Sequence, residues 1–332
     1  MPSTQRKRLN LALQGGGAHG AYTWGCLERL LDEPELEIGA ISGTSAGALN
    51  GAALVSGFAK DGAEGAKKRL RQLWTGVAQA GAPLTFFMFP LRKPGMGIWD
   101  DVMPLTSPYQ ANPFGMSPLR TLLDAVIDVE ALQQAKGPHL FVNAVNVRTA
   151  CTRLFEPREM SVDALLASAC APLMFQGVEI DGEVYWDGSY ASNPTLAPLY
   201  NGEPPDVDIL MVELTPLNRS EVPTSAKNIL NRINEIASIN GLMAELQAIE
   251  LANRNITGAD IRFHVVSMPE EPGALMLEPS VKRTVGMEVF ESLRESGYAA
   301  CGRWLEVHGN SLGVRSSVDS RSKYLERSDR EV

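Results

Sequence analysis

The sequence has few cysteines, few aromatic residues and no excess of positive charge. Cys26, Cys151, Cys170 and Cys301 are the only cysteines among 332 residues and form no C-x-x-C pair, so neither a disulfide framework nor a zinc site is indicated. Lys and Arg number 30 against 39 Asp and Glu, which gives a net charge of −9. This acidic balance argues against nucleic acid as a partner. We expect a globular protein of a reducing, cytoplasmic compartment.

Long apolar runs are also scarce. Residues 38–59 carry no charge and could span a bilayer, but their glycine, serine, threonine and asparagine content favours a buried strand, turn and helix. Arg6-Lys7-Arg8 precedes an apolar stretch that is short and interrupted by Asn10, which is not typical of a signal peptide. We therefore expect neither a transmembrane helix nor a signal peptide.

The remaining pattern alternates apolar strands with helical periodicity. Strands are predicted at residues 9–14, 38–42, 139–147, 208–214 and 261–266. Helices are predicted at residues 18–31, after residue 47 to about 58, and at 62–80, 117–127, 161–170, 225–255 and 284–308. Apolar strands that alternate with helices imply an α/β fold, a three-layer sandwich with a mostly parallel central sheet and helices on both faces.

Two regions depart from this rhythm. Residues 83–118 hold seven of the 21 prolines together with many Phe and Met residues, so we expect a cap that leaves the main fold. Polar and charged residues dominate the end of the chain, and we predict a disordered tail over 311–332. The resulting organisation is an N-terminal arm (1–8), one domain (9–310) and that tail.

The segment Gly43-Thr44-Ser45-Ala46-Gly47 matches G-x-S-x-G between an apolar strand and an apolar helix. In that context the glycines allow a sharp turn that exposes the serine hydroxyl as a nucleophile. The alternative interpretation is a serine that only caps a helix. The strand–turn–helix context favours the nucleophile.

A second glycine motif lies close before it. Gly15, Gly17 and Gly20 match G-x-G-x-x-G, which is typical of nucleotide-binding oxidoreductases, but the acidic residue expected at the end of the second strand is missing. Backbone N–H groups of such a loop can instead stabilise an oxyanion. Because both motifs follow neighbouring predicted strands, they would open on the same edge of a parallel sheet.

A nucleophilic serine needs a base. In a Ser-His-Asp carboxylesterase the base would be a late histidine, His264 or His308. His264 lies in an apolar strand and His308 ends a helix, while His19 sits in the glycine loop. Asp187-Gly188 follows directly on a strand, where loops at sheet edges carry function. The residues alone leave these alternatives open.

Taken together, the motifs resemble the patatin-like phospholipases. The resemblance rests on GGGAHG at 15–20, GTSAG at 43–47, the D-G pair at 187–188 with Asn193-Pro194 behind it, and ASACAPLMF at 167–175. It covers about residues 9–310 and implies the patatin-like fold.

The resemblance implies a serine lipid acyl hydrolase, of the phospholipase A or lysophospholipase type, that works through an acyl-enzyme. Ser45 would be the nucleophile and Asp187 the proton acceptor, without a histidine. Gly15, Gly16 and Gly17 would form the oxyanion hole. The supporting motif residues are Gly20, Gly43, Gly47 and Gly188.

Two positions depart from the family pattern. His19 stands where the family usually has Lys or Arg, and Ser189 follows the D-G pair where Gly or Ala is usual.

We expect no metal or other cofactor, a lipid or fatty-acyl ester as substrate, and no nucleic acid. The cap would cover a lipid channel, dock on a bilayer interface in transient contact, or be an ordinary packed flap. The oligomeric state is open.

Overall fold

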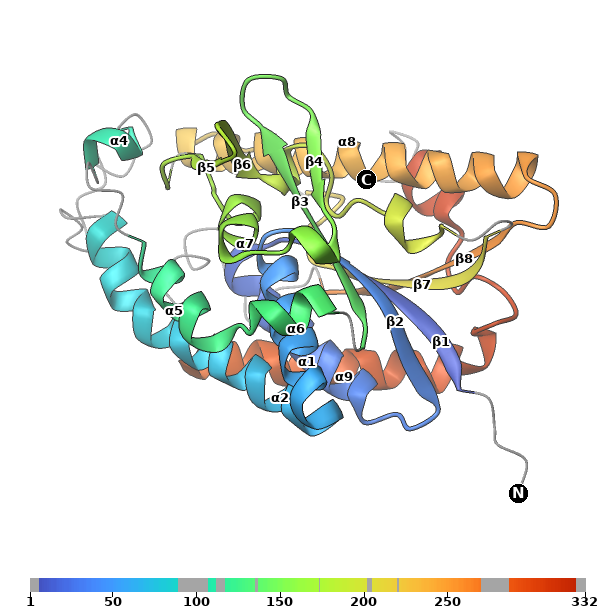
Figure 1. Cartoon of the computed structure of the whole chain (residues 1–332). Coiled ribbons are helices and arrows are strands. Elements are labelled where there is room, and N and C mark those ends of the chain that lie inside the picture. Colours follow the sequence, from blue (N-terminus) through green and yellow to red (C-terminus); the bar gives the residue numbers. More distant parts are fainter. Residues whose placement is uncertain are drawn as a thin grey trace.

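The computed structural model describes residues 6–88, 107–111, 117–134, 137–172, 174–201, 205–219, 221–269 and 287–326 (Figure 1). A central sheet separates two layers of helices. Its strands are β1 (Lys7–Leu13), β2 (Leu36–Gly43), β3 (His139–Asn146), β4 (Thr152–Phe155), β5 (Val178–Ile180), β6 (Glu183–Asp187), β7 (Asp206–Glu213) and β8 (Asp260–Ser267). The predicted three-layer α/β fold is confirmed.

The sheet is mostly parallel. Its strand order is β5-β6-β3-β2-β1-β7-β8, with β4 beside β3. The run from β3 to β8 is parallel, whereas β4, β5 and β6 pair antiparallel. The turn between β5 and β6 is formed by Asp181-Gly182, and both residues adopt positive φ, as a tight hairpin turn requires.

The helices differ greatly in length. They are α1 (Gly20–Leu31), α2 (Ala46–Met88), α4 (Pro108–Ala111), α5 (Pro118–Val126), α6 (Val129–Gln134), α7 (Val162–Ser168), α8 (Ala226–Asn255) and α9 (Met287–His308). The long α2 is two helices joined at Asp61 and Gly62, where the backbone leaves helical angles. This break lies where the sequence pattern changes from one predicted helix to the next.

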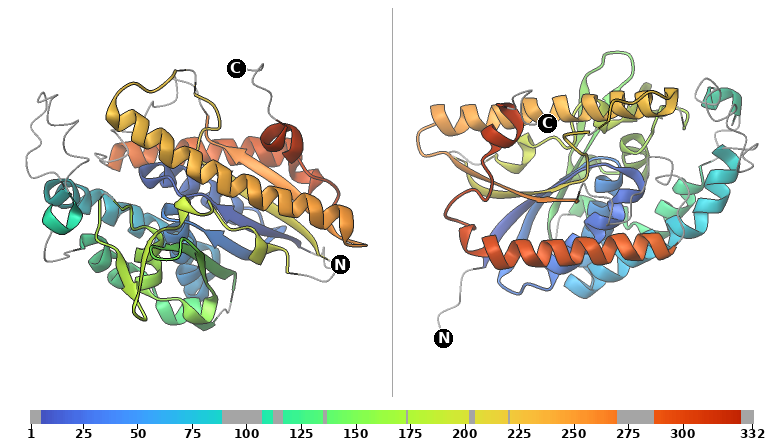
Figure 2. Two further views of the ribbon diagram at one scale, coloured as in Figure 1. Left: turned by 90° about the horizontal axis from the view of Figure 1, so that it is seen from above. Right: turned by 180° about the vertical axis from the view of Figure 1, so that it is seen from behind.

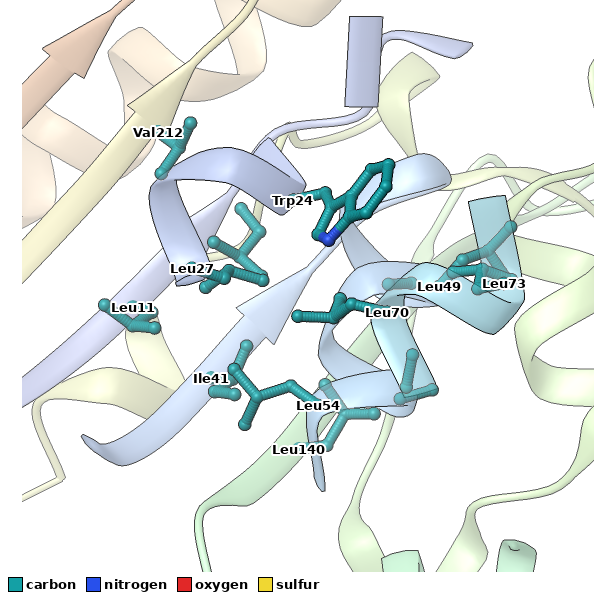
Figure 3. Close-up of a cluster of buried hydrophobic side chains, with 14 of the residues drawn as sticks. Leu11, Trp24, Leu27, Ile41, Leu49, Leu54, Leu70, Leu73, Leu140 and Val212 are labelled. Atoms are coloured by element: carbon teal, nitrogen blue, oxygen red, sulfur yellow. The ribbon is translucent and has the colours of Figure 1, made fainter. Parts of the chain in front are cut away.

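Each face of the sheet buries its own apolar core. On one face, α1, α2 and α9 pack on alternate side chains of the strands, among them Leu11, Ile41 and Leu140 (Figure 3). On the other face, α8 covers residues such as Ile209 and Met211. Figure 2 shows α8 and α9 on opposite sides of the sheet. Both cores hold the strand ends rigidly, so that the loops following them can carry a site.

The structure describes only part of the predicted N-terminal arm (1–8) and of the predicted cap (83–118). Strand β1 begins at Lys7, which pairs with Leu36, so residues 7 and 8 belong to the sheet and not to an arm. Most of the predicted cap (83–118) lies outside the described residues. Within it, the backbone of α2 continues through Pro83 to Met88, beyond the predicted helix end at residue 80.

The prediction of a disordered tail is wrong for residues 311–326. Tyr324 is fully buried, and its hydroxyl donates a 2.7 Å hydrogen bond to Glu213 at the end of β7. The N–H of Gly313 donates to Asp208. Polar composition suggested disorder, but one aromatic anchor and backbone contacts to buried side chains hold this segment on the fold.

Candidate active site

Ser45 lies in the sharp turn between β2 and α2. Its φ is +52°, a left-handed conformation that is uncommon for any residue other than glycine. An ordinary N-cap serine has extended backbone angles, so Ser45 is not a simple cap. Gly47 is required by close packing, because a Cβ there would lie 2.1 Å from the Leu13 carbonyl oxygen. The strained serine and tight glycines are the features of a nucleophile turn.

Asp187 ends β6 and is 6 % exposed. Its carboxylate accepts a 2.9 Å hydrogen bond from the Ser189 N–H, and the nearby Ser45 hydroxyl favours its charged form. Burial raises the pKa of Asp187, and the neighbouring Ser189 and Ser45 groups oppose that rise only in part. The structure therefore places the two predicted residues, 142 positions apart in the chain, near each other.

Cys170 and Tyr190, two titratable neighbours of Asp187, stay protonated at neutral pH. Burial, followed by the nearby Asp187 charge, raises the pKa of Cys170 to about 12. The same two causes, in the same order, raise the pKa of Tyr190 to about 12. Because neither group ionises near neutral pH, Asp187 is the group among these three that can exchange a proton with Ser45.

The glycine loop lies directly against the Ser45 turn. A Cβ on Gly15 would lie 2.8 Å from the Ser45 Cβ, and one on Gly20 would lie 2.7 Å from the Ala46 Cβ. The Gly15 N–H donates a 2.7 Å hydrogen bond to Asn193 Oδ1. This bond removes Gly15 from the set of three predicted oxyanion donors and leaves the N–H groups of Gly16 and Gly17.

Two residues at the site had no role in the sequence analysis. The Ser168 hydroxyl, at the end of α7, accepts a 2.9 Å hydrogen bond from the Ser45 N–H. Asn193 Oδ1 accepts a hydrogen bond from the Gly15 N–H, and Asn193 Nδ2 donates to the Gly15 carbonyl oxygen and to the Ser238 hydroxyl on α8. The Asn193-Pro194 pair was visible behind the aspartate motif, and Ser168 lies in the ASACAPLMF stretch at 167–175, but the resemblance assigned a role to neither residue.

A model of the patatin-like phospholipase family matches residues 11–200. This span contains the glycine loop, Ser45 and Asp187, and it covers more than half of the chain. The chain belongs to the patatin-like phospholipase family. It is accordingly a hydrolase that acts on lipid esters.

Solved structures give weaker similarities. VipD from Legionella pneumophila is 13 % identical, with a TM-score of 0.41, over 96 % of this chain and 73 % of that one. The ExoU–SpcU complex from Pseudomonas aeruginosa is 16 % identical, with a TM-score of 0.33, over 91 % of this chain and 52 % of that one. The chain thus spans about half of that second protein. Among curated proteins, none matches.

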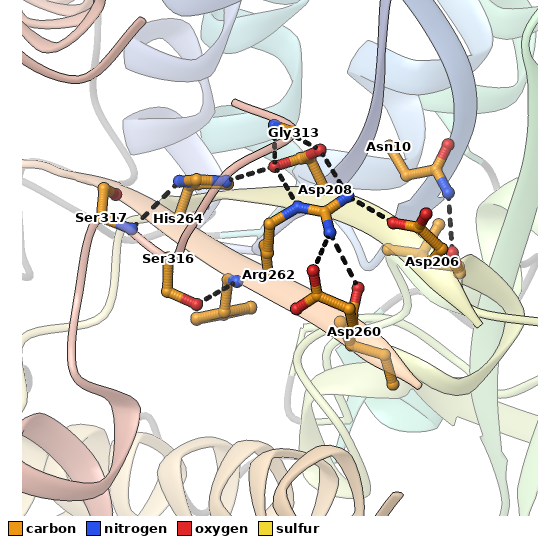
Figure 4. Close-up of polar contacts among 12 residues, drawn as sticks. Asn10, Asp206, Asp208, Asp260, Arg262, His264, Gly313, Ser316 and Ser317 are labelled. Atoms are coloured by element: carbon orange, nitrogen blue, oxygen red, sulfur yellow. Dashed lines mark hydrogen bonds and ion pairs between the residues drawn. The ribbon is translucent and has the colours of Figure 1, made fainter. Parts of the chain in front are cut away.

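The late histidine His264 is committed to other partners. Its Nε2 lies 2.9 Å from Asp208 Oδ1, and its Nδ1 accepts a 3.2 Å hydrogen bond from the Ser317 N–H (Figure 4). Asp208 also accepts two hydrogen bonds from Arg262. The ring is fully buried in a cluster that ties the end of the chain to β7 and β8. His264 therefore has no ring nitrogen to offer Ser45.

His308 lies at the other end of the sheet. It ends α9, and the next residue, Gly309, accepts a hydrogen bond from Lys7 at the start of β1. Ser45 follows the far end of β2, which runs parallel to β1. Neither late histidine reaches Ser45, so the Ser-His-Asp alternative is not supported for this member of the family.

The two departures from the family pattern are compatible with the local geometry. The backbone N–H of Ser189 donates to Asp187, a contact that does not depend on the Ser189 side chain. His19 is buried, and its N–H donates to the Gly16 carbonyl oxygen at 3.2 Å. Both residues therefore support the neighbouring site residue through the backbone.

Across the described residues, no group of three or more His, Cys, Asp or Glu side chains could hold a metal ion. Within the same part of the chain, no helix has the length and apolar character needed to cross a membrane. The uncharged run at 38–59 is accordingly divided between β2 and α2, the strand–turn–helix expected from its small polar residues.

Proposed function

We propose that this chain is an esterase of the phospholipase A or lysophospholipase type that uses a Ser45–Asp187 dyad and forms an acyl-enzyme. The observation that carries the proposal is the Ser45 hydroxyl, in a strained turn, beside the buried Asp187 carboxylate. Membership of the patatin-like phospholipase family supports the same substrate class.

The proposed reaction begins when Ser45 Oγ attacks the ester carbonyl carbon and transfers its proton to Asp187. The collapsing tetrahedral intermediate expels the alcohol, which takes that proton from Asp187 and leaves the acyl group on Ser45. A water molecule then attacks the acyl-enzyme and transfers a proton to Asp187. The second tetrahedral intermediate releases the fatty acid as Ser45 Oγ takes that proton back from Asp187. The raised pKa of Asp187 makes it a stronger base than an exposed aspartate.

The oxyanion of each tetrahedral intermediate would be stabilised by the glycine loop. Gly16 and Gly17 supply the N–H groups, since Gly15 is bound to Asn193. Gly17 has a φ of +58°, which a residue with a side chain rarely adopts. The loss of one such donor typically lowers kcat about 10²- to 10³-fold.

The proposal is tested by fatty-acid release from phosphatidylcholine in mixed micelles and from lysophosphatidylcholine, with a soluble p-nitrophenyl ester as reference. Wild type should hydrolyse all three, and Ser45→Ala should lose nearly all turnover while it keeps the circular dichroism spectrum of wild type. Turnover of the phospholipids by Ser45→Ala at the wild-type rate would overturn the proposal.

A further inference from the structure

The two proposed dyad residues follow strands that are not neighbours. In the sheet order β6-β3-β2, strand β3 separates the strand of Asp187 from the strand before Ser45. Two strand spacings amount to about 9.6 Å between the outer backbones. Because this exceeds hydrogen-bonding distance, both loops must bend over the end of β3 for the side chains of Ser45 and Asp187 to meet.

Asn143 occupies the position on β3 between these loops. Gly43 pairs with Val142, so Thr44 is level with Asn143 on one side. Ala144 pairs with Asp187 in the antiparallel direction, so Gly188 is level with Asn143 on the other side. The register therefore places one side chain beside both the residue that precedes Ser45 and the residue that follows Asp187.

The Asn143 amide binds both loops. Its Oδ1 accepts a 2.5 Å hydrogen bond from the Thr44 hydroxyl. Its Nδ2 donates to the Ser192 carbonyl oxygen at 2.9 Å and to the Gly188 carbonyl oxygen at 3.3 Å. Asn143 and Thr44 are both fully buried, so water cannot replace these partners. The amide orientation is determined by its partners, since one loop offers a hydroxyl donor and the other offers carbonyl acceptors.

The fit around Asn143 is also tight. A Cβ on Gly188 would lie 2.3 Å from the Asn143 carbonyl oxygen and 2.7 Å from its Nδ2. The glycine of the D-G pair is therefore needed so that the aspartate loop can approach β3. This approach places the Gly188 carbonyl oxygen within reach of the amide.

We propose that Asn143, together with Thr44, is a positioning residue that holds the nucleophile turn and the aspartate loop at a fixed separation. The inference rests on the proposed Ser45–Asp187 dyad. Asn143 takes no part in a chemical step. It acts through Thr44, which precedes Ser45, and through Gly188, which follows Asp187. A displacement of about 1 Å between reacting groups can lower the rate about 10²-fold, which is the scale of effect expected from its loss.

The most selective test uses Thr44, because one hydroxyl can be removed at nearly constant shape. With the soluble p-nitrophenyl ester, Thr44→Val should lower kcat about tenfold and leave KM within about threefold, since the lost contact holds the transition-state geometry rather than the substrate. Thr44→Ser keeps the hydroxyl and should retain kcat within about threefold. Asn143→Ala should lower kcat about 10²-fold.

The double variant Thr44→Val/Asn143→Ala provides a further criterion. Because both substitutions break the same contact, it should be little worse than Asn143→Ala alone. If Asn143→Ala does not fold, the Thr44→Val and Thr44→Ser pair decides the question.

Asn10→Ala is the matched control. Asn10 is also a buried amide on a strand, and it accepts from the Ala40 N–H at 2.9 Å and donates to the Leu199 carbonyl oxygen at 2.6 Å. Its removal should lower the melting temperature while kcat stays at the wild-type value. A stability loss alone would therefore not reproduce the effect expected at Thr44 and Asn143.

The outcomes separate the two proposals. Wild-type kcat in Thr44→Val, or an equal loss of kcat in Asn10→Ala at a similar melting temperature, would overturn the positioning role. Wild-type turnover in Ser45→Ala would instead overturn the dyad. A loss of kcat in Thr44→Val with recovery in Thr44→Ser, while Ser45→Ala is inactive, supports both.

Discussion

Gly15 and Ser45 pack against each other with no space for a side chain on the glycine. A Cβ at Gly15 would lie 2.8 Å from the Ser45 Cβ and 3.0 Å from the Thr44 carbonyl oxygen. Asn193 holds the same glycine through its N–H and its carbonyl oxygen. The glycine loop and the nucleophile turn thus form one packed unit, and the geometry of the proposed oxyanion hole depends on both.

Gly15→Ala should therefore damage activity. The added methyl group would push the loop away from the Ser45 turn, and we expect kcat for the p-nitrophenyl ester to fall at least about 10²-fold. Gly302→Ala is the control, because its Cβ would meet only the Arg29 side chain at 3.4 Å. Within α9 this second change should raise stability by up to about 1 kcal/mol and leave kcat unchanged. Normal kcat in Gly15→Ala would contradict the packing argument.

The pH dependence of turnover should report Asp187. Only its carboxylate form can accept the Ser45 proton, and burial raises its pKa. Turnover should therefore fall on the acid side, with a midpoint above the value of about 3.9 for an ordinary aspartate. The measurement is kcat/KM for the soluble ester from pH 3 to 8, over the range in which circular dichroism shows a folded protein. A midpoint at or below that of an exposed aspartate would count against Asp187 as the base.

Asp187→Asn should separate stability from activity. Because the folded-state pKa of Asp187 is raised, its ionisation favours the unfolded chain, and stability is lost as pH rises through the folded-state pKa. Asparagine cannot ionise but can still accept the hydrogen bond from the Ser189 N–H. The variant should be inactive, with a melting temperature at neutral pH at or above that of wild type. The difference should shrink as the pH falls toward the unfolded-state pKa, and a pH-independent loss of stability would contradict this account.

The late histidines should be dispensable for chemistry. His264→Gln loses contacts to Asp208 and the Ser317 N–H and should lower stability by about 1–3 kcal/mol. His308→Gln, at the end of α9, should change stability by less than about 0.5 kcal/mol. Both folded variants should keep wild-type kcat below their melting temperatures. Loss of turnover in either variant at normal stability would restore the Ser-His-Asp alternative.

The parts of this account that were predictable from sequence depend on local patterns. Alternating apolar periodicity identified the strands and long helices, and the G-x-S-x-G motif placed Ser45 in a strand–turn–helix context that β2 and α2 confirm. Family resemblance, rather than spacing, pointed to Asp187. The pairing of these two residues was predictable only because the family supplies it.

The remaining site residues depend on long-range register. Asn143 is one asparagine in an apolar strand, and its role follows from the level at which β3 pairs with both β2 and β6. Gly15 was predicted as an oxyanion donor, yet Asn193, 178 positions away, binds its N–H. The composition of the C-terminal segment predicted disorder, but Tyr324 is buried against α8 and hydrogen-bonded to Glu213. Single-residue anchors of this kind leave no periodic pattern.

The central claim is that Ser45 is a nucleophile activated by Asp187. The most direct test is labelling with a fluorophosphonate probe and peptide mapping of the adduct, in wild type, Ser45→Ala and Asp187→Asn, with excess EDTA present. The account predicts labelling at Ser45 in wild type, none at that site in Ser45→Ala, and a rate in folded Asp187→Asn that falls at least about 10²-fold, within the range expected for loss of a general base. Labelling of Asp187→Asn at the wild-type rate, or of wild type at a residue other than Ser45, would contradict it.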